Sequence, residues 1–419
     1  MIKLTHTALA ILFALQVDAQ ALPPGKPAEN GFSAERLSRI DQLVNEHVEK
    51  QWVNGAVVMI VRNGKVIHHK AYGCSGTEKK VVMRKDDIFR IASQTKAITS
   101  LAVMMLWEEG KFFLDDPVSR YIPEFKNPKV LGTVNWSDTT FSSRPAISEI
   151  TIRQLLTHTS GIDYSAIGSQ EFKAIYKKAG IPSGIGTPKD LLADKMKKLG
   201  EMPLRHNPGE AFTYGLNTDV LGYLVEVISG MSLDQFFRTR IFQPLGMQDT
   251  WFYLPKEKRS RLVPLYEVSN GKLKRVTGKS FDSTDPDYPA NEGRYFSGGA
   301  GLSSTTEDYA RFMQMFLNKG EFNGARLLSR KTVELMLTNQ TQPPITSQFG
   351  LGFGLETDKN DHESIVSLGT FSWGGAFSTS YWADPKEKLI GLIYTNVTTS
   401  PYRSMNEKVR TLIYQAIVD

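Results

Sequence analysis

Apolar residues recur at helical spacing near the start of the chain. Leu37, Ile40, Val44 and Val48 return every three or four positions, which places them on one face of a helix. Ser33 precedes this pattern and belongs to the residue types that cap helix N-termini. We therefore predict an amphipathic helix that begins at Ser33.

Strand patterns lie near both ends of the chain. The β-branched runs AVVMIVR and KVIHHKAYG are joined by Asn63-Gly64, a pair typical of a tight hairpin turn. Residues 378–383 and 389–394 form a second strand pair, and residues 406–418 have the pattern of an amphipathic helix. Asn270-Gly271 predicts a further small hairpin in the middle of the chain.

This arrangement predicts an α/β (α+β) fold built from both chain ends. We expect an antiparallel sheet from residues 33–92 and 317–419, flanked by the two terminal helices. Residues 93–316 contain mostly helical patterns and loops rich in glycine and proline, so we expect them to form an inserted, largely helical part.

The first residues have the pattern of a secretory signal peptide. Lys3 precedes a short apolar run, and Val17-Asp18-Ala19 resembles a cleavage site, so we assign residues 1–19 to the signal. Residues 20–32 contain proline and glycine and are expected to be a disordered lead-in. No other segment has the roughly 20 apolar residues that a transmembrane helix needs. We therefore expect an exported protein, periplasmic or secreted.

Composition excludes several classes of function. The net charge is +6, but its 50 basic residues are spread among 44 acidic ones, and no basic stripe interleaves with aromatic residues. We therefore expect no nucleic-acid partner. The seven histidines show no metal-binding spacing, and His68-His69 would point to opposite faces of a strand, so no metal site is expected. Cys74 is the single cysteine, which excludes an intramolecular disulfide, and the oligomeric state stays open.

Ser93 and Lys96 stand three positions apart at the start of a long apolar run that ends before Gly110. This spacing puts the hydroxyl and the ammonium on one face of a helix. The serine would lie at the positive end of the helix dipole, which favours a developing alkoxide. The pair is therefore either a nucleophile with its base or an ordinary helix cap followed by a surface lysine.

Two later segments could complete such a site. Tyr214 lies in a loop that contains glycine, directly before a new helical pattern. The segment around Trp373-Gly374-Gly375 has two glycines beside a strand, which let the backbone approach a ligand closely. A packed loop tyrosine and a tight turn between strands are the plain alternatives.

Taken in order, these motifs resemble the serine β-lactamase and penicillin-recognising superfamily. The similarity is to its class C-like branch, which includes the family VIII carboxylesterases, and it spans about residues 35–415. Further matching stretches are Leu155-Leu156-Thr157-His158-Thr159-Ser160-Gly161, Pro208-Gly209, Pro244-Leu245-Gly246-Met247 and Gly298-Gly299-Ala300-Gly301-Leu302-Ser303-Ser304-Thr305. The resemblance implies a β-lactamase-like serine hydrolase fold.

The resemblance also implies roles for particular residues. Ser93 would be the nucleophile that forms an acyl-enzyme, and Lys96 and Tyr214 would share the proton transfers, with the general base left open. The backbone N–H groups of Ser93 and Ala376 would form the oxyanion hole. No metal ion or cofactor is implied.

The chain departs from the β-lactamase pattern at two positions. Leu216 stands where β-lactamases have an asparagine that binds the substrate amide, and Trp373 replaces a cationic or titratable residue ahead of Gly374 and Gly375. Losing a charge-assisted contact typically costs about 1.5–3 kcal/mol. We therefore expect Leu216, Trp373, Gly374 and Gly375 to line a site that suits an uncharged ester.

Three functions stay open at this stage. The leading one is a carboxylesterase that acts on small or medium acyl esters. A β-lactamase, D,D-peptidase or D-amino-acid amidase would use the same residues on a lactam or amide. A catalytically silent penicillin-recognising or envelope-binding protein is the third.

Overall fold

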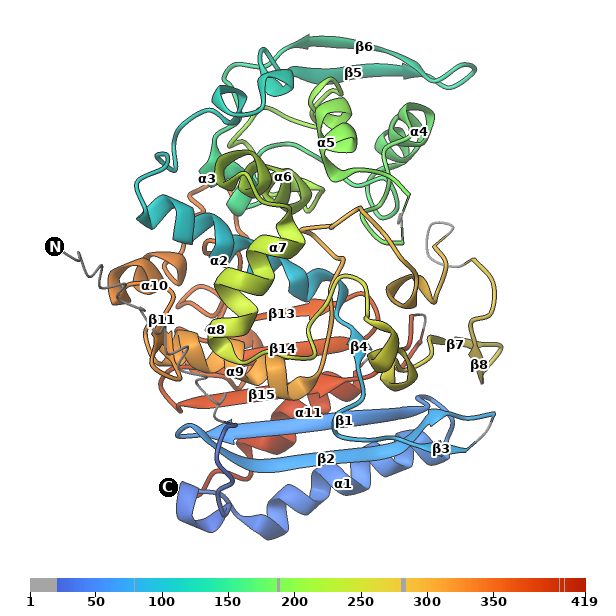
Figure 1. Cartoon of the computed structure of the whole chain (residues 1–419), viewed down its shortest axis with the longest axis vertical. Coiled ribbons are helices and arrows are strands. Elements are labelled where there is room, and N and C mark those ends of the chain that lie inside the picture. The colour runs from blue at the N-terminus through green and yellow to red at the C-terminus, as the bar shows by residue number, and fades with distance from the viewer. Residues whose placement is uncertain (1–20, 79, 187–188, 280–283, 399, 403) are drawn as a thin grey trace, which may run out of the picture.

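Figure 1 shows the computed structural model of the chain, which describes residues 21–78, 80–186, 189–279, 284–398, 400–402 and 404–419. The predicted signal peptide, residues 1–19, lies outside the described residues. The described part of the chain combines one large antiparallel sheet with helices on both of its faces, which confirms the predicted α/β (α+β) class.

Seven strands form the sheet in the order β12-β13-β14-β15-β1-β2-β3, and every neighbouring pair is antiparallel. Their bounds are Gly55–Arg62 for β1, Lys65–Gly76 for β2, Val81–Val82 for β3, Gly354–Leu355 for β12, Phe371–Gly375 for β13, Thr379–Asp384 for β14 and Leu389–Tyr394 for β15. Both chain ends contribute, because β1 pairs with β15 at the centre. The positive φ angles of Asn63 (54°) and Gly64 (73°) match the predicted tight turn between β1 and β2.

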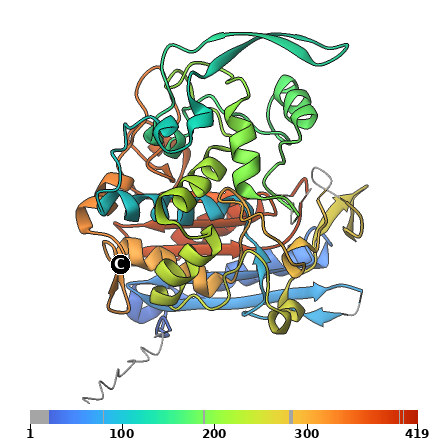
Figure 2. The ribbon, with the colours of Figure 1, turned by 45° about the horizontal axis from the view of Figure 1, so that its top comes forward.

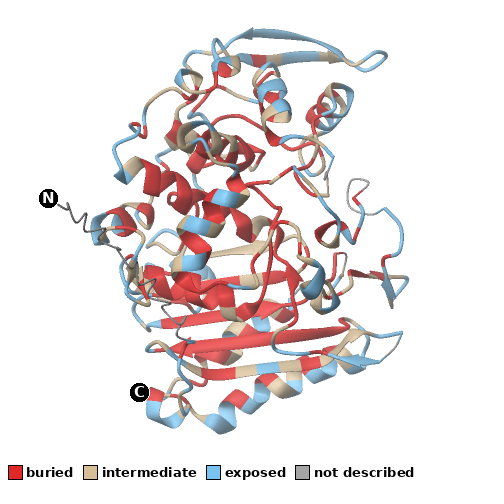
Figure 3. Ribbon diagram, in the orientation of Figure 1, coloured by how far each residue is buried: buried red, intermediate tan, exposed pale blue. Residues whose placement is uncertain are grey.

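The central strands of the sheet are buried on both faces, and their side chains alternate between two hydrophobic cores. Val58 and Ile60 of β1 pack with the terminal helices α1 (Ala34–Glu49) and α11 (Met405–Tyr414). Met59 and Val61 point to the other face, which α9 (Thr306–Leu317) covers. Figure 3 shows the resulting pattern, with buried strands between helices whose outer turns are exposed.

The terminal helices form as the sequence predicts. The Ser33 hydroxyl accepts a hydrogen bond from the Arg36 N–H, so Ser33 caps α1. Residues 21–32, expected to be disordered, instead lie against the fold: Pro24 bridges to Val66, and Phe32 is buried against the sheet core. Burial of apolar side chains such as Phe32 holds this segment against the fold. The segment is too short and too rich in proline and glycine for its sequence to show a periodic hydrophobic pattern.

Most of the remaining helices lie between β4 (Phe89–Arg90) and α9. They are α2 (Thr95–Glu108), α3 (Ile152–Leu156), α4 (Gln170–Ala179), α5 (Leu192–Gly200), α6 (Asn217–Ser229), α7 (Leu233–Phe237) and α8 (Gln243–Leu245), and α10 (Arg330–Met336) follows α9. The predicted helical insertion extends to residue 316 and so includes most of α9. In the structure α9 instead packs on the sheet, because its apolar side chains join the core beneath β1 and β15.

Four short strand pairs complete the fold. They are β4 with β9 (Ser303–Ser304), β5 (Lys129–Asn135) with β6 (Thr140–Pro145), β7 (Tyr266–Ser269) with β8 (Lys272–Arg275), and β10 (Glu321–Phe322) with β11 (Ala325–Arg326). The β7–β8 hairpin turns at Asn270-Gly271, as predicted. Figures 1 and 2 show the unpredicted β5–β6 hairpin extending from the helical part at the end farthest from the sheet.

No single helix among the described residues is long and apolar enough to cross a membrane. One pair of helical stretches, Asn217–Ser229 and Leu233–Leu245, meets that criterion only when taken together, and an 80° bend separates them.

Candidate active site

Ser93 lies on a tight helical turn, Ala92–Gln94, between β4 and α2. Every residue from Asp87 to Leu106 is buried except Ser93, which is partly exposed. Ala92 adopts a positive φ of 42°, which is strained for a residue with a side chain. The fold therefore holds one hydroxyl at the surface of an otherwise buried segment.

Neighbouring strands and helices hold this turn in place. The Tyr394 hydroxyl of β15 donates a hydrogen bond to Gln94 Oε1 over 2.6 Å, and the Tyr309 hydroxyl of α9 donates to the Gln94 carbonyl over 2.8 Å. The Thr95 hydroxyl donates to the Ala92 carbonyl over 2.7 Å. Sheet and helix contacts thus compensate the strain at Ala92, which keeps Ser93 in one orientation.

Lys96 is buried, with 3% of its surface exposed, and its ammonium makes three hydrogen bonds. Nζ donates to Ser93 Oγ over 3.3 Å, to the Tyr164 hydroxyl over 2.9 Å and to the Gly299 carbonyl over 2.7 Å. The structure therefore brings Ser93 and Lys96 together as the three-residue spacing predicts.

Tyr214 completes the predicted group. Lys96 Nζ lies 4.6 Å from the centre of the Tyr214 ring, and the Trp373 indole N–H donates to the Tyr214 hydroxyl over 3.3 Å. Tyr214, Trp373 and Lys96 come from a loop, from β13 and from α2, so three distant segments meet beside Ser93. An activated hydroxyl, a buried amine and a phenol at these distances can support nucleophilic acyl transfer.

Tyr164 is a site residue that the sequence reasoning missed. Its hydroxyl accepts the hydrogen bond from Lys96, and its ring centre lies 5.4 Å from that of Tyr214. Burial, with the neighbouring Tyr214 and Asp219 as smaller causes, holds the pKa of Tyr164 well above its usual range. Tyr164 is therefore a neutral phenol at physiological pH. The only signal was its place, three residues after the stretch that ends at Gly161.

Gly375 allows β13 to approach the serine turn. A β-carbon at this position would lie 2.4 Å from the Ile91 carbonyl oxygen and 2.2 Å from Thr379 Oγ1, too close for any side chain. A β-carbon on Gly374 would meet nothing nearer than the Thr379 carbonyl at 3.4 Å. The close approach places Ala376, which is half-buried, on the strand end that packs against the turn carrying Ser93.

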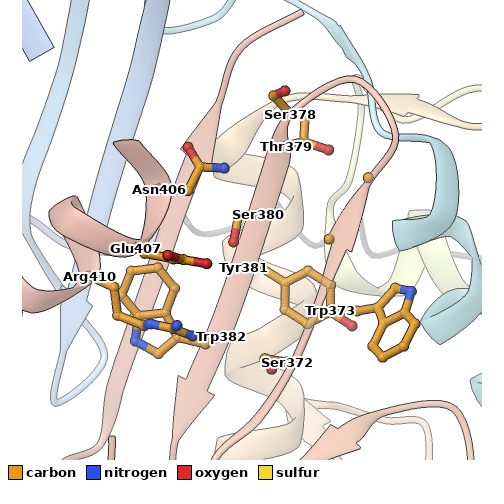
Figure 4. Close-up of a pocket in the computed structure, with 12 residues that line it drawn as sticks. Ser372, Trp373, Ser378, Thr379, Ser380, Tyr381, Trp382, Asn406, Glu407 and Arg410 are labelled. Carbon is orange, nitrogen blue, oxygen red and sulfur yellow. The ribbon is translucent and has the colours of Figure 1, made fainter. Parts of the chain in front are cut away.

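Figure 4 shows a pocket of about 370 Å³ beside β13 and β14. Gly374, Gly375 and Trp373 line part of it, and Glu407 and Arg410 of α11 lie on its far side. The Trp373 indole points away from these α11 side chains. The pocket therefore borders the strand of the candidate site, whereas Trp373 turns its ring toward Tyr214 on the other side.

Leu216 does not fit the substrate-binding role predicted for it. Its side chain is 0% exposed and belongs to the hydrophobic core. The amide of the next residue, Asn217, is also buried, where it contacts His158 Nδ1 over 3.0 Å and accepts a bond from the Ser160 hydroxyl. The loop after Tyr214 turns inward at once into α6, so neither side chain faces the site.

His158 packs against the ring of Tyr214. Its ring centre lies 4.8 Å from that of Tyr214, and burial, with a smaller effect of Lys96, holds its pKa well below the usual range. A neutral, buried imidazole that packs under Tyr214 has a structural role.

His68 and His69 point to opposite faces of the sheet, as expected, toward Tyr72 and Thr306 respectively. Within the ranges that the structure describes, no three acidic, histidine or cysteine side chains are grouped to hold a metal ion.

Comparisons with known proteins identify relatives of this chain. Protein Rv1367c of Mycobacterium tuberculosis (strain H37Rv) is 33% identical over 366 residues, which cover 84% of this chain and 87% of that protein. Esterase EstB of Burkholderia gladioli is 28% identical over 399 residues, covering 92% of this chain and 96% of that one. The solved structure of EstCE1, described as a hydrolase with promiscuous acyltransferase activity, superposes with a TM-score of 0.77 and 26% identity, covering 91% and 99% of the two chains.

A model of the family described as Beta-lactamase matches residues 40–415. The match extends over nearly the whole chain and contains Ser93, Lys96, Tyr214 and Trp373. It confirms the resemblance inferred from these motifs and the β-lactamase-like fold. The chain therefore belongs to the beta-lactamase family of serine hydrolases.

Proposed function

We propose that this protein is a serine carboxylesterase that cleaves small or medium acyl esters. One observation carries the proposal: Ser93 is the one partly exposed residue of a buried segment, and its Oγ lies 3.3 Å from the buried Lys96 ammonium. A hydroxyl held beside a buried amine at the surface is poised to act as a nucleophile.

In this reaction Ser93 Oγ attacks the ester carbonyl and forms a tetrahedral intermediate. Its proton passes to the group formed by Lys96 and Tyr214, and the same group returns a proton to the departing alcohol. The backbone N–H groups of Ser93 and Ala376 would stabilise the oxyanion. Water then attacks the acyl-enzyme, which releases the carboxylic acid and restores the Ser93 hydroxyl.

Two features favour an ester over a β-lactam. Trp373 places an indole where β-lactamases hold a substrate carboxylate with a cationic group, and its N–H is already bonded to Tyr214. Neither Leu216 nor Asn217 presents a polar group to the site, since both side chains are fully buried. The esterase and hydrolase names of EstB and EstCE1 support the same choice.

The test is to assay p-nitrophenyl butyrate and nitrocefin side by side, with the wild type and Ser93→Ala. We expect ester turnover that depends on Ser93 and little turnover of nitrocefin. Faster turnover of nitrocefin than of the ester would show a β-lactamase instead. A fluorophosphonate that leaves no adduct on the wild type, measured by intact mass, would show a catalytically silent protein.

We also propose that the protein is exported, on the basis of the signal-like pattern in residues 1–19. Expression of the full chain in a Gram-negative host, followed by fractionation and intact-mass measurement, tests this. Export predicts a periplasmic or secreted product that has lost about twenty N-terminal residues. A full-length product in the cytoplasm would contradict the proposal.

A further inference from the structure

A carboxylate is buried beneath the Lys96 ammonium. Asp219 lies in the first turn of α6, five residues after Tyr214, and its side chain is 0% exposed. The Ser297 hydroxyl donates a hydrogen bond to Asp219 Oδ1 over 2.6 Å. Burying a carboxylate is costly, so its presence in the buried first turn of α6 requires an explanation.

This carboxylate and Lys96 both lie against Gly299, on the side where a side chain would project. A β-carbon on Gly299 would lie 2.4 Å from Asp219 Oδ2 and 3.6 Å from Lys96 Nζ. The Gly299 carbonyl accepts the shortest of the three hydrogen bonds from Lys96, and all three acceptors of that ammonium are neutral. Asp219 is thus a buried anion on the same side of Gly299 as the Lys96 ammonium, and the two charges interact through space.

Asp219 also anchors the turn that carries this carbonyl. The Ser297 hydroxyl, which is bonded to Asp219, accepts the Ala300 N–H over 3.0 Å, and the Gly301 N–H donates to the Ser297 carbonyl over 3.0 Å. Gly299 lies between these two anchors. The orientation of its carbonyl toward Lys96 therefore depends on the bond between Ser297 and Asp219.

We infer that Asp219 is a positioning residue for the reaction proposed above. It holds the turn from Ser297 to Gly301 so that the Gly299 carbonyl receives Lys96, and its negative charge stabilises the Lys96 ammonium that donates to Ser93 Oγ during the acyl transfer. The inference rests on the proposed acyl transfer at Ser93. Because a fully buried carboxylate touches no substrate, Asp219 should affect kcat rather than substrate binding.

The charge of Asp219 changes within an accessible pH range. Burial, opposed by the Ser297 hydrogen bond and by Lys96, raises its pKa to about 6. The other titratable groups that face it are the phenols of Tyr164 and Tyr295, whose pKa values burial holds well above the usual range. Both phenols are neutral near pH 6, so the carboxylate is the group of this cluster that ionises there.

The experiment compares Asp219→Asn with Ser297→Ala and with Asp308→Asn. Asp308 is a matched control, since it is a buried aspartate of α9 that accepts a threonine hydroxyl from Thr250 over 2.9 Å. For each protein, kcat and KM for p-nitrophenyl butyrate are measured from pH 5 to 9, per active site titrated with a fluorophosphonate. The rate of fluorophosphonate labelling of Ser93 is recorded as well.

We expect Asp219→Asn to lower kcat and the labelling rate by about 10- to 100-fold, with KM within twofold. We expect wild-type activity to fall below about pH 6, as Asp219 becomes protonated, and Asp219→Asn to lack this fall. Ser297→Ala keeps the charge, so it should lower kcat by less and retain that fall. Asp308→Asn should match the wild type in both respects.

An Asp219→Asn protein with wild-type kcat and pH profile would overturn the inference. Asp219→Ser is made in parallel, so that the inference is still tested if one of the two Asp219 variants does not fold. Failure of the proposed function is distinguishable, because wild-type protein without ester turnover would refute the esterase assignment. The labelling rates of Ser93 would still report on Asp219.

Discussion

The indole N–H of Trp373 donates a hydrogen bond to the hydroxyl of Tyr214 over 3.3 Å, and the two ring centres lie 5.5 Å apart. The two residues are separated by 159 positions, so this bond joins β13 of the sheet to the loop before α6. It orients the phenol beside Lys96, and it occupies the only N–H donor of the indole ring.

Replacing Trp373 with phenylalanine keeps an aromatic ring but removes the donor. We expect kcat for p-nitrophenyl butyrate to fall by about 3- to 10-fold, because one neutral hydrogen bond contributes about 0.5–1.5 kcal/mol. Trp136→Phe is the matched control, since Trp136 is exposed on the β5–β6 hairpin far from the sheet, and should leave kcat unchanged. Equal rates for Trp373→Phe and the wild type would show that the bond does not orient Tyr214.

Gly375 and Gly374 are neighbours that differ in the space around them. Gly375→Ala would place its methyl group 2.4 Å from the Ile91 carbonyl oxygen, so β13 must move away from the serine turn. We expect a loss of about 1–3 kcal/mol in the free energy of unfolding and a fall in kcat/KM of at least 10-fold. Gly374→Ala has 3.4 Å of clearance and should change both quantities little. Equal behaviour of the two variants in urea unfolding and ester assays would contradict this account.

Lys96→Met keeps the length of the side chain and removes the amine. General acid–base catalysis contributes typically about 100- to 10,000-fold, so kcat should fall within that range. Lys177→Met is the control, because Lys177 is exposed on α4 and lies outside the predicted catalytic group. Circular dichroism of both variants checks folding, and residual activity above one-tenth of the wild type in Lys96→Met would exclude Lys96 from proton transfer.

Buried histidines make the fold sensitive to acid. Burial lowers the pKa of His68 to about 4. Between about pH 6.5 and pH 4, His68 is therefore protonated in the unfolded chain but neutral in the folded protein. The stability contributed by neutral His68 is therefore complete at pH 7.5 and is lost as the pH falls through this window. For one such group the loss is about 1–2 kcal/mol at pH 5.

The variant His68→Gln tests this, because glutamine can still contact the Tyr72 hydroxyl, which lies 3.0 Å from His68 Nε2. We expect the difference in unfolding free energy between pH 7.5 and pH 5 to shrink in the variant. The change is measured by urea unfolding at both pH values. An unchanged difference would show that His68 does not contribute to acid destabilisation.

Elements whose signals are local can be predicted from residue spacing and turn chemistry alone. Asn-Gly turns predict both hairpins because two residues with positive φ fit a tight turn, and Ser33 predicts the start of α1 because its hydroxyl caps the first turn. The Ser93–Lys96 pair is equally local, since a spacing of three residues brings both side chains to one helix face. The ordered motifs also identified the family, and with it the fold class.

The surroundings of that pair depend on contacts between segments that are distant in the sequence. Lys96 contacts the Gly299 carbonyl across 203 positions and Tyr164 across 68, and residue spacing predicts neither contact. Leu216 faces the core rather than a substrate because α6 begins directly after it. Asp219 acquires its place beneath Lys96 through the packing of α2 and α6. Contacts between distant segments depend on how the chain closes around the core, which residue spacing along the chain does not encode.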